Sequence, residues 1–176
     1  VNRKSFVVIL HFSPDYKSIL SEIISKYSFL KVVKIENHMA IEADTIYIAP
    51  SDSMLRLEND VFILNSITSS KSNSLFYPVD NFLISLAESY ESMSIAVILS
   101  GNGSDGSVGI EAIKEKFGLV IAQEPATAKY PAMPASAIAT GLVDFILSPE
   151  DIAGVLFKYI NDFNCPRGQS EIDEAH

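Results

Sequence analysis

The apolar positions of this sequence fall into short runs that alternate with segments of helical periodicity. The runs predict strands and lie at 6–10, 32–35, 45–49, 95–99, 119–122 and 143–147. The helical segments, in which apolar residues recur every three or four positions, lie at 15–27, 79–90, 107–117, 134–140 and 149–163. Strands that alternate with helices in this way predict an α/β fold with a doubly wound, mostly parallel sheet and helices on both faces.

A small antiparallel hairpin is expected to interrupt this alternation. Three polar residues separate the apolar runs 54–57 and 61–64, a spacing that is typical of a hairpin. The run 6–10 is apolar without interruption, so we expect it to form a strand that is buried on both faces. The stretch 66–74 is rich in Ser, Asn and Lys and predicts an exposed loop.

Length and composition fit one globular domain. With 176 residues, of which 48% are apolar, the chain can bury a substantial core. We expect this domain to occupy residues 1–165 and a polar, acidic tail or linker to occupy residues 166–176. The sequence starts at Val1 and enters an apolar run almost at once, so we expect the domain to be incomplete at its N-terminus.

Charge and side-chain content narrow the classes of partner and cofactor. The net charge of −9 argues against nucleic acids and anionic membranes, since both favour clusters of Lys and Arg. No apolar run approaches the roughly 18 residues of a membrane span. A single cysteine, Cys165, excludes an intrachain disulfide and suits a reducing cytoplasm. His11, His38 and His176 show no metal-ligand spacing, so we expect no metal and place His38 in a surface turn.

The segment 95–109, IAVILSGNGSDGSVG, carries the most informative chemistry of the sequence. An apolar run leads into a loop with four glycines and a carboxylate, Asp105, and His11 follows the run 6–10 in the same way. Because the carboxyl ends of parallel strands share one edge of a sheet, where ligands bind, these two side chains can meet there. An aspartate that accepts a hydrogen bond from one ring nitrogen fixes the histidine tautomer and leaves the other nitrogen as a general base.

Two other interpretations of these residues stay open. His11 can be an ordinary histidine at the edge of the core, with Asp105 as a turn residue. The loop 101–106 also matches the glycine spacing of a dinucleotide-binding fingerprint, and Glu124 lies near the distance expected for its acidic residue. Against the fingerprint, the loop is not in the first strand–helix unit, and Asp105 would repel a pyrophosphate at the helix N-terminus.

Several blocks of the sequence, in order, resemble one family. SGNGSDGSVG and IAQEPATAKYPAMPASAIATGLVD are similar to the catalytic domain of CheB-type protein-glutamate methylesterases of bacterial chemotaxis. Further upstream, LHFSPDYKSILSEI resembles the histidine segment of that family, HMAIEADTIYIAP the stretch before its hairpin, and YPVDNFLISLAE the helix before its aspartate loop. The resemblance covers about residues 6–155 and is closest to esterase domains that are fused to a receptor methyltransferase.

The resemblance implies a serine hydrolase, without a cofactor, that cleaves glutamate γ-methyl esters on chemoreceptors. By position, His11 resembles the catalytic base and Asp105 the acid that orients it. Asn102 stands beside the oxyanion site, where the family commonly has Met, and Met133 resembles the methionine at the cleft rim. The segment 77–80, YPVD, stands where the family often has Arg-Pro-Ser-x-Asp, so the arginine of that motif is missing here.

The nucleophile is the main departure from the family pattern. The family places it in a glycine-rich serine loop, after a strand that precedes the histidine strand, and all eight glycines here lie at or beyond Gly101. Ser13, Ser100 and Ser104 lie near strand ends, but we expect each to be a turn or cap hydroxyl. We therefore expect the nucleophilic serine to lie outside this chain and the chain alone to be inactive.

Beside the dinucleotide-binding domain mentioned above, two functions remain open at this point. One is the methylesterase, and the other is a non-catalytic remnant of that domain that binds receptor or regulates a fused methyltransferase. In both, the resemblance implies methylated chemoreceptor cytoplasmic domains as partners, a fused methyltransferase or receiver domain as a second candidate partner, and a cytoplasmic location.

Overall fold

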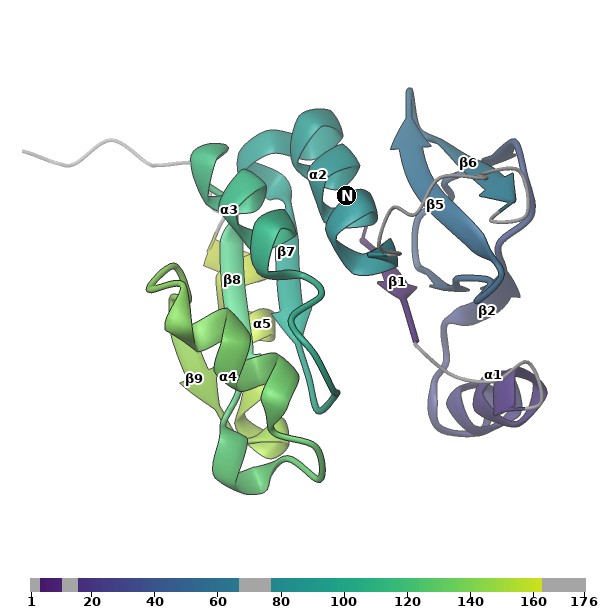
Figure 1. Cartoon of the computed structure of the whole chain (residues 1–176). Helices are drawn as coiled ribbons and strands as arrows, with labels where there is room; N and C mark the ends of the chain where they lie inside the picture. The colour runs from purple at the N-terminus through teal and green to yellow at the C-terminus, as the bar shows by residue number, and fades with distance from the viewer. Residues whose placement is uncertain (1–3, 11–15, 67–76, 163–176) are drawn as a thin grey trace, which may run out of the picture.

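The strands of the protein form three small sheets in the computed structural model, which describes residues 4–10, 16–66 and 77–162 (Figure 1). Two of the sheets are parallel. One has the order β1 (Ser5–Val8), β4 (Thr45–Ile48), β2 (Lys31–Lys34), and the other β7 (Ile95–Ile98), β8 (Leu119–Gln123), β9 (Phe145–Leu147). The third is antiparallel, with the order β3 (Met39–Ala40), β6 (Val61–Ser66), β5 (Ser53–Glu58). The expected α/β class with a small antiparallel hairpin is confirmed.

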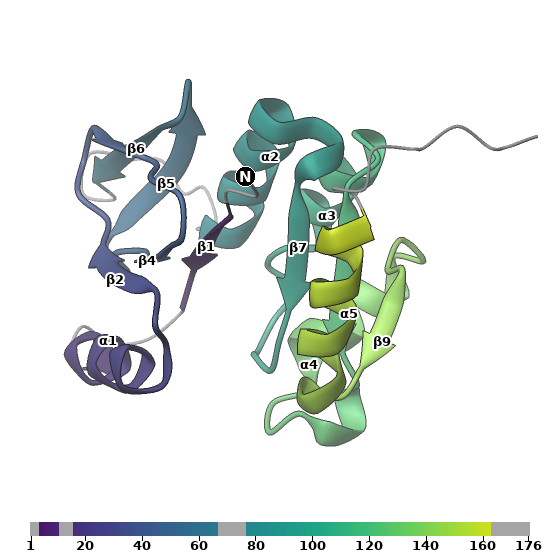
Figure 2. The same ribbon diagram turned by 180° about the vertical axis from the view of Figure 1, so that it is seen from behind.

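Helices cover both faces of the β7–β8–β9 sheet. The helices of the fold are α1 (Tyr16–Tyr27), α2 (Pro78–Tyr90), α3 (Ser107–Glu115), α4 (Ala132–Ala139) and α5 (Pro149–Asp162), with short 3₁₀ turns η2 (Glu91–Met93) and η3 (Pro125–Thr127). Leu119 and Ile121 of β8 pack with Ile152 of α5, whereas Val120 belongs to the larger core that includes α3. This alternation is that of a strand between two layers, and Figure 2 shows α5 on the face opposite α3 and α4.

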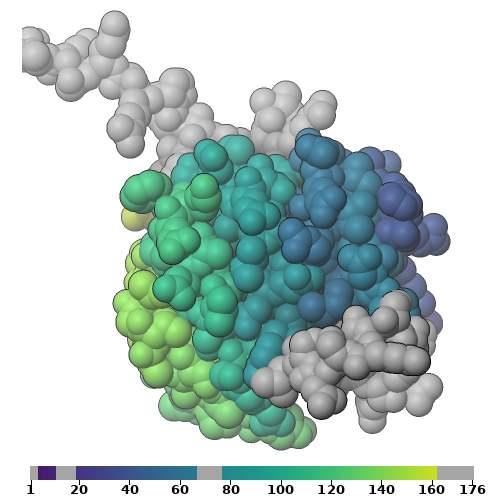
Figure 3. Space-filling view, turned by 45° about the horizontal axis from the view of Figure 1, so that its top comes forward, coloured from purple at the N-terminus to yellow at the C-terminus, as the bar shows by residue number. Residues whose placement is uncertain are grey.

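α2 joins the hairpin to the rest of the domain. Its Ser85 hydroxyl accepts a hydrogen bond from the Leu57 amide (3.0 Å), and the Asn81 side chain donates to the Leu55 carbonyl (3.1 Å). The opposite side of α2 contacts α3 at Gly109. In the space-filling view (Figure 3) the teal surface of α2 lies between the blue hairpin and the green α3. The N-terminus of α2 is therefore fixed from two sides.

The structure corrects several expectations from the sequence. The strand in the run 6–10 is not buried on both faces, since Phe6 is 41% exposed, and among the described strands β1 pairs only with β4. The parallel strands are divided between two sheets. α4 begins two residues before the predicted start, since Pro134 within a first turn has no amide to pair. β3, with two residues, was too short to recognise from its pattern.

Other expectations are confirmed or lie outside the described residues. The hairpin forms with Glu58 opposite Val61, as the spacing predicted. His38 lies exposed in a turn with a φ of 63°. Most of the predicted loop 66–74 and the whole tail 166–176 fall outside the described residues, so the proposed boundary between domain and tail stays a prediction.

Candidate active site

The loop between β7 and α3 is shaped by glycine. Gly103 and Gly106 have φ angles of 86° and 100°, which side chains rarely adopt. A Cβ atom on Gly106 would lie 3.1 Å from the Ile98 Cδ1 atom and 3.2 Å from the Val79 Cγ1 atom. The loop therefore turns sharply at the carboxyl end of β7 and passes close to the first turn of α2.

Asp105 lies in this loop and caps α2. Its carboxylate accepts hydrogen bonds from the Val79 amide (3.0 Å, at Oδ2) and from the Asp80 amide (2.9 Å, at Oδ1). Tyr77, the residue before the helix, supplies no side-chain cap, and Pro78 has no amide hydrogen to offer. A carboxylate is well suited to the positive end of the helix dipole. Asp105 is only 6% exposed, so the orientation of its carboxylate is fixed by the backbone of α2.

Asp80 completes a reciprocal arrangement of the two helices. It is the third residue of α2 and is 8% exposed, and its Oδ1 atom accepts a hydrogen bond of 2.7 Å from the Gly109 amide in the first turn of α3. Burial raises the pKa of the Asp80 carboxyl, and the nearby charge of Asp105 adds to this, while the backbone amides of the α3 terminus oppose it. The buried carboxylate of Asp105 thus binds the N-terminus of α2, and that of Asp80 binds the N-terminus of α3.

A second set of hydrogen bonds supports the start of the loop. The Gln123 carboxamide oxygen accepts from the Ser100 amide (2.9 Å), and the Ser100 hydroxyl accepts from the Tyr130 amide (3.0 Å). The Gly101 amide donates to the Tyr130 carbonyl, and the Met133 amide donates to the Gly101 carbonyl, both at 2.9 Å. The segment that leads into α4 therefore fixes the base of the Asp105 loop.

The structure brings most of the predicted site residues together. Met133 packs on the loop, since a Cβ atom on Gly101 would lie 2.7 Å from its sulfur atom. Asn102 lies exposed in the same loop. His11 lies outside the described residues, so its expected approach to Asp105 remains a prediction.

Two of the three candidate serines lie within the described residues. The Ser100 hydroxyl has a structural role, but it accepts from the Tyr130 amide 30 residues away and so links two distant segments instead of closing a turn or capping a helix. Ser104 lies exposed in the loop, and its carbonyl accepts from the Ser107 amide at 3.2 Å. Ser13 lies outside the described residues.

The sequence pattern singles out neither Asp80 nor Gln123 as a site residue, although both lie within segments that resemble the family. A single acidic residue in the first turn of a helix usually faces water, so Asp80 gives no distinct signal. Gln123 ends an otherwise apolar strand, LVIAQ, and is 5% exposed. A polar residue that closes a buried strand was the available signal, because a buried amide needs hydrogen-bond partners.

The geometry argues against a dinucleotide at the glycine loop. A pyrophosphate would need the free amides of the α3 N-terminus, and the Gly109 amide is bonded to Asp80. The buried carboxylates of Asp80 and Asp105 would also repel its charge. The glycines here allow a close approach of α2 and α3 rather than of a phosphate.

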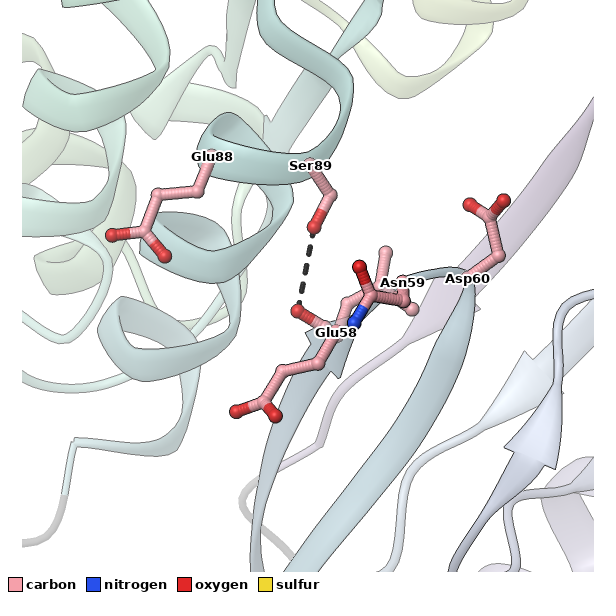
Figure 4. Close-up of a pocket in the computed structure, with 6 residues that line it drawn as sticks. Glu58, Asn59, Asp60, Glu88 and Ser89 are labelled. Carbon is pink, nitrogen blue, oxygen red and sulfur yellow. Dashed lines mark hydrogen bonds between the residues drawn. The ribbon is translucent and has the colours of Figure 1, made fainter.

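A hollow of about 500 Å³ lies at the other end of α2, between its last turn and the hairpin tip. From Val79 to Ser89 the helix rises about 15 Å, so this hollow is separate from the Asp105 loop. Figure 4 shows that the carboxylates of Glu58, Asp60 and Glu88 point in different directions. Among the described residues, no group of His, Cys, Asp and Glu side chains is arranged to hold a metal ion.

Comparisons with known proteins point to one family. Residues 2–156 match the family described as CheB methylesterase. A putative protein-glutamate methylesterase/protein-glutamine glutaminase of Leptospira interrogans is 33% identical over 152 residues, which are 86% of this chain and 78% of that protein. A protein-glutamate methylesterase/protein-glutamine glutaminase of Syntrophomonas wolfei is 32% identical over 84% of this chain and 44% of its own length.

Two further matches are a much longer protein and a solved structure. A 104.1 kDa protein of Rhodobacter capsulatus is 34% identical over 80% of this chain, which spans only 14% of that protein. The crystal structure of the Thermotoga maritima CheB methylesterase catalytic domain matches with a TM-score of 0.79 and 34% identity, over 87% of this chain and 82% of that one. Within the described residues, no helix has the length and apolar character needed to cross a membrane. The family match and the matching fold show that this chain belongs to the CheB methylesterase family.

Proposed function

We propose that this chain is the larger part of a catalytic domain that hydrolyses glutamate γ-methyl esters on the cytoplasmic domains of chemoreceptors by a Ser-His-Asp mechanism. The main observation behind the proposal is the buried Asp105 carboxylate at the carboxyl end of β7. Both of its oxygens accept hydrogen bonds from backbone amides of α2. Each carboxylate oxygen can accept more than one hydrogen bond, so this fixation is compatible with orienting an imidazole.

In the proposed reaction the serine oxygen attacks the ester carbonyl carbon while His11 takes the hydroxyl proton. Asp105 orients His11 and stabilises its positive charge. Backbone amides beside Asn102 stabilise the oxyanion of the tetrahedral intermediate. The intermediate collapses, the bond to the methoxy group breaks, and His11 returns the proton to release methanol. A water molecule, deprotonated by His11, then attacks the acyl-enzyme, and His11 returns the proton to the serine oxygen as the glutamate side chain is released.

The proposed nucleophile lies on a segment outside this chain. Ser100 uses its hydroxyl to fix the loop, which leaves it poorly suited to attack an ester. Among the described strands, β1 pairs only with β4 and β7 only with β8, so both have an edge that a further parallel strand can use. A strand that paired with both edges would join the two parallel sheets and deliver the following loop to the carboxyl edge, near Asp105.

Methanol release from a methylated receptor domain tests this proposal. The natural full-length protein should turn over the ester, and a polypeptide of residues 1–176 should have little or no activity, because the members of a triad act as a unit. Turnover by residues 1–176 that is lost on Ser104→Ala or Ser13→Ala would contradict the placement of the nucleophile. Receptor binding without turnover by the full-length protein would favour the non-catalytic module.

Hydrolysis of a side-chain amide is a second candidate activity of the same site. The relatives in Leptospira and Syntrophomonas carry the name of a protein-glutamine glutaminase beside that of a methylesterase. An amide is attacked by the same nucleophile and differs in its leaving group, so His11 would have to protonate the amide nitrogen of the tetrahedral intermediate for ammonia to leave. Ammonia release from an unmodified receptor domain by the full-length protein tests this activity separately from methanol release.

A further inference from the structure

Asp80 is a buried carboxylate that has no part in the reaction proposed above. Its side chain accepts the short hydrogen bond from the Gly109 amide, while its own backbone amide donates to Asp105. The same residue therefore bonds to the loop through its backbone and to α3 through its side chain. The loop that carries Asp105 is enclosed between these two attachments.

Close packing makes this connection rigid. A Cβ atom on Gly109 would lie 2.6 Å from the Leu83 Cβ atom and 3.1 Å from the Asp80 Cα atom, so α3 packs against α2 with no room for a side chain at this position. Gly106, next to Asp105, makes a similar approach to Val79. Any relative shift of the two helices would therefore be transmitted to the Asp105 carboxylate.

Burying the charged carboxylate of Asp80 is energetically unfavourable. Removal from water penalises the carboxylate, and the Asp105 charge beside it adds a repulsion. A neutral side chain would avoid both costs, although it would lose or weaken the bond to Gly109. A side chain that lowers stability is expected next to a candidate catalytic group when it holds that group in the geometry that the reaction needs.

We propose that Asp80 is a positioning residue for Asp105. By binding the Gly109 amide, it keeps the N-terminus of α3 against α2, so that the loop presents the Asp105 carboxylate in one orientation. This inference rests on the proposed function, since it gives Asp80 a role only if Asp105 orients a catalytic histidine.

A double-mutant cycle in the natural full-length protein tests the proposal with methanol release from a methylated receptor domain. Asp80→Ala should lower kcat about 10- to 100-fold, with KM within about threefold of the wild-type value, because a misplaced orienting group affects the chemical step. Asp80→Asn keeps an oxygen that accepts from Gly109 and should recover most of kcat. In an Asp105→Asn background, Asp80→Ala should cause no further loss.

Glu88→Ala is the matched control, because it removes an exposed carboxylate from the same helix. Its kcat should equal that of the wild type. If Asp80→Ala does not fold, as judged by circular dichroism, Asp80→Ser replaces it in the cycle. A wild-type kcat for the folded Asp80 variant, an equal loss in Asp80→Asn, or an undiminished further loss in the Asp105→Asn background would overturn the role of Asp80. A wild-type kcat for Asp105→Asn itself would instead overturn the proposed function.

Discussion

The close approach of α2 and α3 predicts that two glycine-to-alanine substitutions in helices have opposite effects on stability. Gly109 lies in α3 against Leu83, and Gly154 lies in α5 with no atom within 4 Å of an added Cβ. Neither has a positive φ angle, so alanine fits both backbones. In a helix interior alanine is more favourable than glycine by about 0.8–1 kcal/mol. This gain applies in full to Gly154, inside α5, and less to Gly109, in the first turn of α3.

Only Gly109 carries a packing penalty. The added Cβ would lie 2.6 Å from the Leu83 Cβ atom, and ordinary contact begins near 3.4 Å, so the helices must separate by about 0.8 Å (3.4 minus 2.6). Overpacking of this kind costs about 1–3 kcal/mol. Separation also weakens the charged hydrogen bond from Gly109 to Asp80, which is worth about 1.5–3 kcal/mol when intact. Gly109→Ala should therefore destabilise the protein by about 1–3 kcal/mol net.

Urea unfolding of the full-length protein, followed by circular dichroism, measures the difference. Gly154→Ala should raise the free energy of unfolding by about 0.5–1 kcal/mol, and Gly109→Ala should lower it. If Gly109→Ala proved as stabilising as Gly154→Ala, the close contact between α2 and α3 would be wrong, and with it the rigid placement of the Asp105 loop.

Two further predictions concern groups outside the candidate site. Asp144 accepts from the Lys114 ammonium at 2.7 and 2.9 Å and from the Val120 amide at 2.8 Å, so Asp144→Ala should lower the free energy of unfolding by about 1–2 kcal/mol in a urea titration. Burial, together with the hydrogen bond to Asp60, raises the pKa of Tyr90 to about 12. Because the folded state favours the neutral phenol, this contribution to stability is complete below the ordinary pKa of 10.0 and is lost as the pH rises through about 12. Burial also raises the pKa of Tyr159, so the late-titrating component of tyrosinate absorbance should become smaller in Tyr90→Phe, and an unchanged amplitude would refute the assignment.

The sequence alone was sufficient to locate Asp105 but not to explain its orientation. A buried strand followed by a glycine-rich loop and a helix predicts a side chain at the carboxyl edge of the sheet, and the structure has that arrangement. The donors to Asp105 lie about 25 residues earlier, at the start of α2. Bonds between segments so far apart leave no local pattern, so neither the cap nor the reciprocal bond of Asp80 could be predicted.

The strand patterns predicted the hairpin and the buried strands, but not the division of the parallel strands between two sheets or the exposure of β1. The hairpin and the buried strands β4 and β8 follow from their apolar runs and turn residues. The run 6–10 looks as apolar as β8, yet β1 lies at a sheet edge with Phe6 partly exposed. An apolar run shows that a strand can be buried on both faces, but the elements that pack on the two faces of the sheet decide whether it is.

The rate of ester hydrolysis by Asp105→Asn in the natural full-length protein tests the central claim most directly. The asparagine keeps the size of the side chain but can stabilise the wrong histidine tautomer, so kcat for methanol release should fall by about 10³- to 10⁴-fold. Asp151→Asn, the same change in the exposed first turn of α5, should leave kcat at the wild-type value. A folded Asp105→Asn variant with a kcat close to wild type would contradict the assignment of Asp105 as the orienting carboxylate of a serine esterase.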